Sequence, residues 1–187
     1  MSGEGHAGGH RPGTRAFVGL GSNLGDRLAE LRAGLAALAS HPRIETLAVS
    51  GVYESDYVGP GGPQAAYLNA CACLLTELRP QALLAALKLI ERGRGRTGET
   101  HMRPRALDLD ILLYGDLVWR EPDLTIPHAR LIERAFVLEP LAELDAALIL
   151  PDSGQTVGRL CAMIRAAHGR TAHRRPELLL STVAAVD

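Results

Sequence analysis

Strand-like and helix-like segments follow one another in this sequence in an order that few folds can accommodate. Short apolar runs alternate with stretches in which leucines recur every three or four residues, as on one face of a helix. Strands are predicted over residues 16–20, 44–53, 67–77 and 106–114, and helices over residues 28–38 and 80–90. This order predicts an α+β fold with a ferredoxin-like βαββαβ core. Two helices should cover one face of an antiparallel sheet, leaving the other face free for a ligand.

Residues that begin or end helices support this segmentation. Asp26 can cap the first helix, Pro42 ends it, and Pro80 can open the second. Further helical segments are expected around residues 131–144 and after Thr156, which is a suitable cap. The core should therefore carry extra helices on its C-terminal side. A turn after the fourth strand is expected to lead into a short return strand over residues 117–119.

The chain length of 187 residues suits a single domain. We expect a flexible leader over residues 1–14, one domain over residues 15–168 and a C-terminal tail over residues 169–187. A formal net charge of -1 argues against a nucleic-acid partner, and no apolar stretch reaches the ~18 residues of a membrane span. Three cysteines are expected to be free buried thiols in a reducing compartment. The sequence therefore predicts a cytoplasmic protein with no membrane partner. We expect a monomer, although the sequence itself does not determine the oligomeric state.

Positive charge is concentrated in one segment. Five of the 19 arginines lie within residues 92–105, where Glu99 is the only acid. A run of this kind is most often a solvated charged face. Here, however, a strand with two acids that could hold Mg²⁺ follows at once, and guanidinium groups beside a Mg²⁺ site are what phosphoryl transfer requires. The segment is therefore a candidate for binding phosphate groups.

Asp108 and Asp110 occupy alternate positions of the fourth predicted strand. Alternate strand residues share a face, so the two carboxylates should point the same way, roughly 7 Å apart. The core-facing side is expected to consist of Leu107, Leu109, Ile111 and Leu113. Two adjacent carboxylates repel each other unless a cation lies between them, and oxygen ligands suit Mg²⁺. The alternative is an exposed strand face with two solvated acids.

Residues 104–110 (PRALDLD) resemble the signature of the 6-hydroxymethyl-7,8-dihydropterin pyrophosphokinases, a family of folate-synthesis enzymes. Other family-like pieces follow the family's order: GSNL at residues 21–24, YLNA at 67–70, Glu91 with GRGR at 93–96, and PH at 127–128 with RAF at 134–136. Each piece alone is a weak signal, but five in order are very specific. The resemblance covers about residues 15–160.

The resemblance implies transfer of the terminal diphosphate of ATP to the pterin hydroxymethyl oxygen, giving AMP and the pterin diphosphate. It implies that Asp108 and Asp110 hold two Mg²⁺ ions, and that Arg94 and Arg105 contact the transferring group. The implied ATP contacts are Lys88, Glu91, Arg96, Thr125, His128 and the backbone of Ile111. The implied pterin contacts are Ser55, Asp56, Val58, Tyr67, Asn69 and Phe136.

Simpler explanations exist for several of these residues. Tyr67 and Phe136 could be ordinary core residues, and His128 an ordinary loop histidine. A ferredoxin-like sheet could also serve as a non-catalytic ligand-binding module, although such a module has no use for two adjacent acids. The same acids could instead belong to a metal-dependent phosphohydrolase, which would release phosphate or pyrophosphate without a pterin.

The sequence departs from the family pattern in its loops. Many members carry Trp-Gly where Met102 and Arg103 stand here, with His101 before them, and proline where Asp56 stands. Met102 is expected to supply apolar cover in place of the tryptophan ring. The loops over residues 56–66 and 93–104 are expected to close after ATP binds, which would exclude water.

Overall fold

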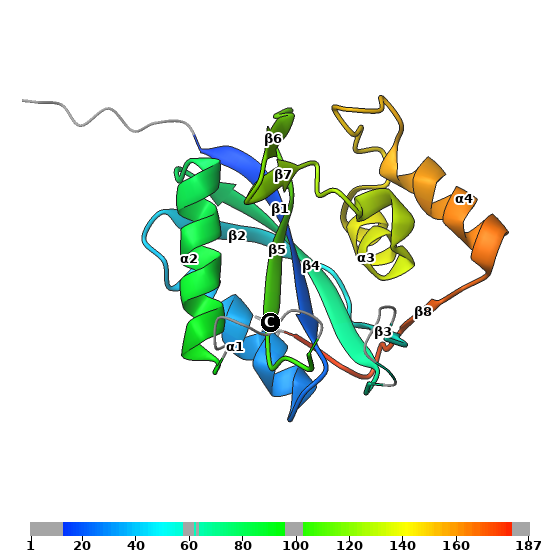
Figure 1. Cartoon of the computed structure of the whole chain (residues 1–187), viewed down its shortest axis with the longest axis horizontal. Coiled ribbons are helices and arrows are strands. Elements are labelled where there is room, and N and C mark those ends of the chain that lie inside the picture. The colour runs from blue at the N-terminus through cyan, green and yellow to red at the C-terminus, as the bar shows by residue number, and fades with distance from the viewer. Residues whose placement is uncertain (1–12, 58–61, 63, 96–102, 181–187) are drawn as a thin grey trace, which may run out of the picture.

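The central sheet has the strand order of a ferredoxin-like fold (Figure 1). This computed structural model describes residues 13–57, 62, 64–95 and 103–180. Strand β1 (Thr14–Ser22) pairs antiparallel with both β4 (Tyr67–Thr76) and β5 (Asp108–Tyr114). On its other side, β4 pairs with β2 (Ile44–Val49) and β3 (Tyr53–Ser55). The predicted α+β class and core topology are therefore confirmed.

Helices α1 (Arg27–Ala39) and α2 (Pro80–Gly93) cover one face of the sheet, as predicted. The Asp26 carboxylate accepts a hydrogen bond from the Ala29 amide at 3.1 Å, and Pro80 lies in the first turn of α2. The helices and strands share a core whose fully buried members include Leu31, Leu38, Leu74, Leu83, Leu87 and Leu109. This tightly packed layer is the first apolar core of the protein.

The opposite face is partly covered, which corrects the prediction that it is free. Helices α3 (Ala135–Asp145) and α4 (Val157–His168) follow a single turn of 3-10 helix (Leu131–Glu133) and contribute to a second apolar cluster on this face. Thr156 caps α4 by accepting a hydrogen bond from the Arg159 amide at 3.3 Å. The extra C-terminal helices were predicted, but their contact with the sheet was not.

The residues of β4 explain why only part of that face is covered. Tyr67 and Asn69 begin the row of side chains on this face, and Cys71 and Cys73 continue it. The two cysteines are free thiols buried in the second apolar cluster, as predicted. Because apolar surface is stabilised by burial and polar groups need partners or water, the helices pack over the cysteine half. The half that carries Tyr67 and Asn69 stays open.

Two of the predicted strands differ from those observed. The predicted strand over residues 44–53 is divided into β2 and β3, because the ladder with β4 shifts register after Thr46 and the chain leaves the ladder after Val49. There the Ser50 hydroxyl accepts the hydrogen bond of the Cys71 amide at 2.9 Å. The predicted return strand over residues 117–119 is also wrong, because β6 (Trp119–Glu121) pairs with β7 (Leu124–Ile126) in a separate hairpin.

A bulge in β5 corrects the predicted core-facing side. Phe17 pairs with Leu113 and Val18 with Ile111, so Leu112 is the extra residue in the ladder. Leu113 therefore lies in the second apolar cluster rather than beside Ile111. The register before the bulge is regular, so Asp108 and Asp110 do share a face.

Residues beyond the predicted end of the domain also join the sheet. Strand β8 (Ala172–Arg174) pairs antiparallel with β3 and forms the sheet edge farthest from β5 (Figure 1). Leu178 and Leu180 then pack against the first apolar core. Within the described ranges, each helix is too short or too polar to span a membrane.

The ion pair between Glu139 and Arg165 joins α3 to α4. Burial raises the pKa of Glu139, but the hydrogen bonds and charge of Arg165 outweigh it and bring the pKa below its ordinary value. Because Glu139 is 2% exposed, Arg165→Ala leaves a buried carboxylate without its partner and should cost about 2 kcal/mol. A lowered carboxylate pKa stabilises the fold above the unfolded pKa, and this stability is lost as the pH falls. Urea unfolding should therefore show a large deficit of the variant at pH 7 that shrinks toward pH 4; an equal deficit at both pH values contradicts this role.

Candidate active site

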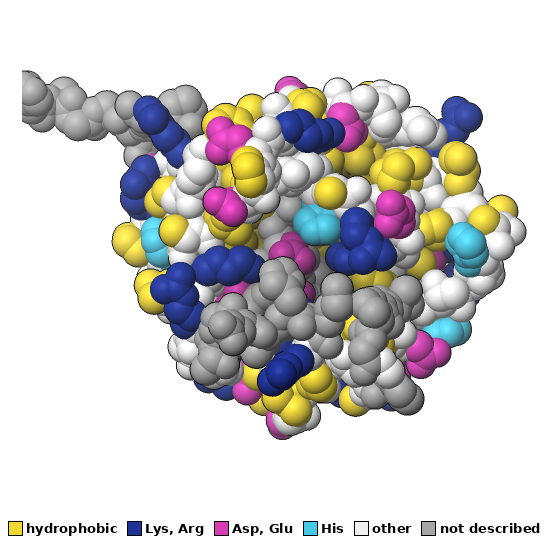
Figure 2. Space-filling view, viewed as in Figure 1, with side chains coloured by type: hydrophobic (Ala, Val, Ile, Leu, Met, Phe, Trp, Pro, Cys, Tyr) yellow, Lys and Arg dark blue, Asp and Glu magenta, His cyan; other side chains and the backbone are white. Residues whose placement is uncertain are grey.

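A cavity of about 690 Å³ opens over the uncovered half of the sheet. Its walls come from β1, β4 and β5, the loop after β3, the β6–β7 hairpin and the segment that leads into α3. Figure 2 shows acidic, basic and histidine side chains gathered around a hollow on this face. The lining includes twelve of the residues predicted from the sequence: Ser55, Asp56, Tyr67, Asn69, Lys88, Arg105, Asp108, Asp110, Ile111, Thr125, His128 and Phe136.

Two glycines of β1 provide the floor between the acids and β4. Gly19 pairs with Asp110, and Gly21 pairs with Asp108 on one side and with Asn69 on the other. A Cβ atom at Gly21 would lie 3.7 Å from Asn69 Oδ1 and 3.8 Å from Asp108 Cβ. The missing side chain at Gly21 therefore leaves Asp108 and Asn69 bordering one continuous space, whereas the Leu112 side chain lies 3.4 Å from the Cβ position of Gly19. Sequence analysis missed this role, although the Gly-x-Gly spacing within a strand is a visible signal.

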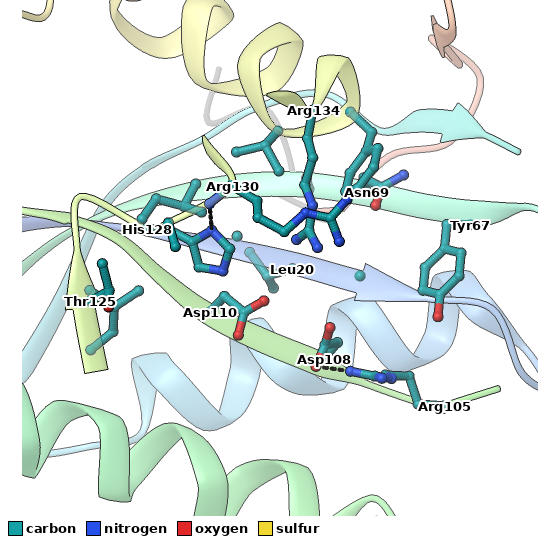
Figure 3. A pocket seen from close by; sticks show the side chains of 18 of the residues that line it. Leu20, Tyr67, Asn69, Arg105, Asp108, Asp110, Thr125, His128, Arg130 and Arg134 are labelled. Atoms are coloured by element: carbon teal, nitrogen blue, oxygen red, sulfur yellow. Dashed lines mark hydrogen bonds and ion pairs between the residues drawn. The ribbon is translucent and has the colours of Figure 1, made fainter. Parts of the chain in front are cut away.

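Asp108 and Asp110 point into the cavity from alternate positions of β5 (Figure 3). Burial, and then the negative charge of Asp108, raise the pKa of Asp110 above its ordinary value. Asp108 is held by Arg105, whose Nη1 donates to its Oδ1 at 2.8 Å. Without a bound cation, the ionised form of Asp110 is therefore disfavoured. A cation beside the two acids would relieve the repulsion between the Asp108 and Asp110 carboxylates.

The donor set at these acids fits Mg²⁺. Among the described residues, no group of three or more His, Cys, Asp or Glu side chains could hold a metal ion. Mg²⁺ does not need such a cluster, because it is commonly held by one or two carboxylates together with substrate phosphates and water. Asp108 and Asp110 supply the carboxylates, and the open cavity has room for phosphate ligands.

His128 is oriented by two backbone contacts. Its own amide donates to the Leu112 carbonyl at 2.9 Å, and its Nδ1 accepts from the Arg130 amide at 3.2 Å (Figure 3). Burial lowers the pKa of His128, and the opposing charge of Asp110 does not reverse this. The ring is therefore neutral near pH 7, with its proton on Nε2, where it can donate to an anion. The structure therefore places His128 at the wall of the cavity, and its contact with ATP stays a prediction.

Arg130 and Arg134 also line the cavity, which sequence analysis did not predict. Figure 3 shows both side chains extending over the sheet from the segment before α3, on the side opposite Asp108 and Asp110. Burial, and then the charge of Arg130, lower the pKa of Arg134. Two arginines held close together favour a bound anion. Their spacing of four residues, directly after Pro127 and His128, was the available signal.

Lys88 and Glu91 of α2 form an ion pair, but only Lys88 reaches the cavity. Lys88 lines the cavity, and its Nζ lies 3.0 Å from Glu91 Oε1. Glu91 is fully buried between α2 and β5, where it accepts a hydrogen bond from the Leu109 amide at 2.7 Å. Glu91 does not line the cavity, so the structure does not give it the predicted contact with ATP. It holds Lys88 against the strand that carries the two acids.

The other end of the cavity has the character of a pocket for a flat polar ring. Tyr67 and Phe136 are half-buried and line the cavity, so neither is simply a core residue. Asn69 is buried, and its Nδ2 donates to Ser55 Oγ at 3.0 Å. Tyr57, which sequence analysis missed, stacks on Tyr67 with ring centroids 6.3 Å apart. Aromatic faces and a fixed amide can bind a heterocycle by stacking and edge recognition.

Some predicted residues do not lie at the cavity. Arg94 lies at the end of α2 and makes a two-pronged ion pair with Glu30, with contacts of 2.6 and 2.7 Å. Val58, Arg96, His101 and Met102 lie outside the described residues, as does much of both predicted closing loops.

A cavity that can hold a divalent cation against phosphate groups, with an aromatic pocket beside it, is typical of metal-dependent enzymes that act on phosphate groups. The comparison with known proteins is more specific. Residues 17–146 match the family of 7,8-dihydro-6-hydroxymethylpterin-pyrophosphokinase (HPPK). The chain therefore belongs to this family, which the sequence motifs had indicated.

Individual relatives support this assignment. The chain is 44% identical over 138 residues to the 2-amino-4-hydroxy-6-hydroxymethyldihydropteridine pyrophosphokinase of Pseudomonas aeruginosa, covering 74% of this chain and 85% of the relative. It is 41% identical over 149 residues to the enzyme of the same name from Synechocystis, covering 80% and 75% of the two chains.

Solved structures share the fold at low sequence identity. A crystal structure of HPPK-DHPS in complex with substrates superposes with a TM-score of 0.69 at 12% identity, covering 88% of this chain and 47% of that chain. Wild-type HPPK-DHPS of Plasmodium falciparum gives a TM-score of 0.67 at 13% identity, covering 89% and 48%. The chain thus spans about half the length of these structures.

Proposed function

We propose that this protein transfers diphosphate from ATP to 6-hydroxymethyl-7,8-dihydropterin, giving AMP and the pterin diphosphate in folate biosynthesis. One observation carries the proposal: the paired carboxylates and the aromatic pocket belong to a single cavity, joined across Gly21. A triphosphate at the acids and a pterin at the amide would therefore lie side by side in the same cavity. Bringing two substrates together in this way is itself a large part of catalysis.

The phosphate half of the cavity is assigned to MgATP. Asp108 and Asp110 would hold Mg²⁺, for which we propose two ions, and the bound metal would neutralise charge on the triphosphate oxygens. Lys88 and Arg130 line the cavity and supply positive charge, and Arg134 adds charge from beside the Phe136 ring. Neutral His128 donates a hydrogen bond from Nε2. Thr125 and the backbone of Ile111 complete this half. Arg105 lies between the two halves and stabilises the transferring group.

The aromatic half is assigned to the pterin. Tyr67 and Phe136 provide faces for stacking, and Asn69 and Ser55 hydrogen-bond to the edge of the ring. Asp56 follows Ser55 at the rim of the same pocket. Arg94, Arg96, Glu91 and Val58 keep their proposed roles only through the family resemblance. For Arg94, the ion pair with Glu30 would have to open before the side chain could reach the transferring group.

The products distinguish this function from its alternatives. We expect AMP to form when the protein is incubated with ATP, Mg²⁺ and hydroxymethyldihydropterin, and to require all three. ADP as the product, or no turnover, contradicts the proposal. Release of phosphate or pyrophosphate without pterin would instead identify a metal-dependent phosphohydrolase.

The assembly and location of the enzyme form part of the same proposal. We infer a cytoplasmic monomer, because the cavity is built within one chain and the three cysteines are free and buried. Light scattering of the purified protein would measure its mass, and a dimer would contradict this inference.

A further inference from the structure

Strand β3 is short, yet it controls one wall of the pterin pocket. Its three residues pair with β4 so that Tyr53 is opposite Asn69 and Ser55 is opposite Tyr67. Asn69 Nδ2 donates to Ser55 Oγ at 3.0 Å and lies 3.4 Å from the Tyr53 carbonyl. A shift of β3 would therefore move the hydrogen-bond partners of the amide. Three residues form too few ladder contacts to hold this geometry alone.

On the α3 side, Arg174 of β8 and Glu143 of α3 hold the start of β3. Glu143 Oε2 accepts a hydrogen bond from Tyr53 Oη at 2.8 Å, and its Oε1 accepts from the Gly51 amide at 3.2 Å. Arg174 Nη2 donates to the same Oε1 at 3.0 Å. A Cβ atom at Gly51 would meet Arg174 Nε at 2.9 Å, so the guanidinium lies directly against the backbone before β3.

On the α1 side, Arg175 holds the middle residue of β3. Its Nη1 is in close contact with the Glu54 carboxylate, and its amide donates to the Val52 carbonyl at 2.8 Å. Arg27 Nη1 also binds Glu54, at 3.0 Å, and donates to the Ala66 carbonyl at 2.7 Å. Glu54 lies before the loop over residues 56–66 and Ala66 at its end, so this cluster fixes both ends of the loop that borders the pocket.

We propose that Arg174 and Arg175 are positioning residues for the pterin, acting through β3 from its two faces. The inference rests on the proposed function, and it extends that function to residues outside the matched range 17–146. Neither arginine lines the cavity. Arg174 acts through Glu143, which contacts Tyr53 of β3, and Arg175 acts through Glu54, which belongs to β3. Strand β3 in turn places Ser55 beside Asn69. Among the described residues, the side-chain hydrogen bonds of Arg174 and Arg175 go to Glu143, Glu54 and Glu177 and not to the phosphate half of the cavity.

Separate measurements of the KM for the pterin and the KM for ATP test the proposal in the full chain. In the variants Arg174→Ala and Arg175→Ala, the KM for hydroxymethyldihydropterin should rise about threefold to fivefold, the scale of a partly exposed ion pair. The KM for ATP should stay unchanged, because neither arginine contacts the described residues of the phosphate half of the cavity. Arg175→Lys should recover part of the loss, since it keeps the charge on Glu54. Hydrogen exchange of the Tyr53–Ser55 amides should become faster in the alanine variants.

The matched control is Arg32 of α1, which binds the same terminal segment. Arg32 donates two hydrogen bonds to the Leu179 carbonyl but does not contact β3, so Arg32→Ala should leave both KM values unchanged. Arg175→Gln keeps most of the side-chain volume and replaces Arg175→Ala if that variant does not fold. An unchanged pterin KM in the Arg174 and Arg175 variants, an equal rise in both KM values, or an equal effect of Arg32→Ala overturns the proposal. Failure of the wild-type protein to form AMP overturns the proposed function instead.

Discussion

Asp110→Asn should reduce kcat about 10³-fold without unfolding the protein. Asp110 faces the cavity from β5, beside Asp108, and burial and the Asp108 charge already raise its pKa. Asparagine has nearly the same shape but lacks the charge that attracts a divalent cation. The metal-free variant should melt at the same temperature as the wild type or higher, because one of two repelling carboxylates is removed. A large loss of activity with no loss of stability is the signature of a functional acid.

AMP formation and thermal melting, each with and without Mg²⁺, measure the two parts of this prediction. Asp116→Asn is the matched control, since Asp116 is exposed in the turn directly after β5. It should leave both activity and melting temperature unchanged. Activity of Asp110→Asn within about tenfold of the wild type would remove Asp110 from the proposed metal site.

Arg105→Ala should lower kcat by about 10²-fold or more while weakening ATP binding much less. Arg105 lines the cavity, and its guanidinium is fixed by Asp108 at 2.8 Å, so it needs little reorganisation to meet charge that develops during transfer. An interaction that strengthens in the transition state lowers kcat when it is removed, whereas uniform binding changes KM alone.

Single-turnover AMP formation and equilibrium binding of ATP separate these effects for Arg105. Arg105→Lys should recover only part of the rate, because an ammonium group cannot make the two-pronged contact of a guanidinium. Arg159→Ala, at an exposed position of α4, controls for the loss of one positive charge. Equal losses in ATP affinity and in rate would refute a role in the transition state.

The fold was predictable to the extent that it depends on local patterns. The period-2 alternation around Asp108 placed both acids on one face, and the caps Asp26 and Thr156 marked real helix starts. The bulge at Leu112 was not predictable, because it depends on how β5 fits against β1. The cover of α3 and α4 over the sheet is likewise a tertiary effect, which no local period encodes.

The candidate site divides in a similar way. Residues on strands, such as Tyr67 and Asn69, face the cavity because a strand fixes their direction. Arg130 and Arg134 were missed because they belong to an irregular segment whose side-chain directions come from packing. Arg94 was placed by its neighbours in the sequence, but in the folded chain its charge is paired with Glu30. The order of the motifs therefore identified the family, whereas the contacts of individual residues such as Arg94 depend on the folded chain.

The buried position of Glu91 has a consequence for solubility. Strand β5 is at the edge of the sheet, and an exposed edge strand is a template on which another chain can add a strand and start aggregation. Here Glu91 accepts from the Leu109 amide, Lys88 lies 3.4 Å from the Leu109 carbonyl, and His128 donates to the Leu112 carbonyl. Outward-facing backbone groups of the edge are thus occupied by side chains and backbone from the site itself. These contacts leave fewer free backbone groups on which a second chain could add a strand.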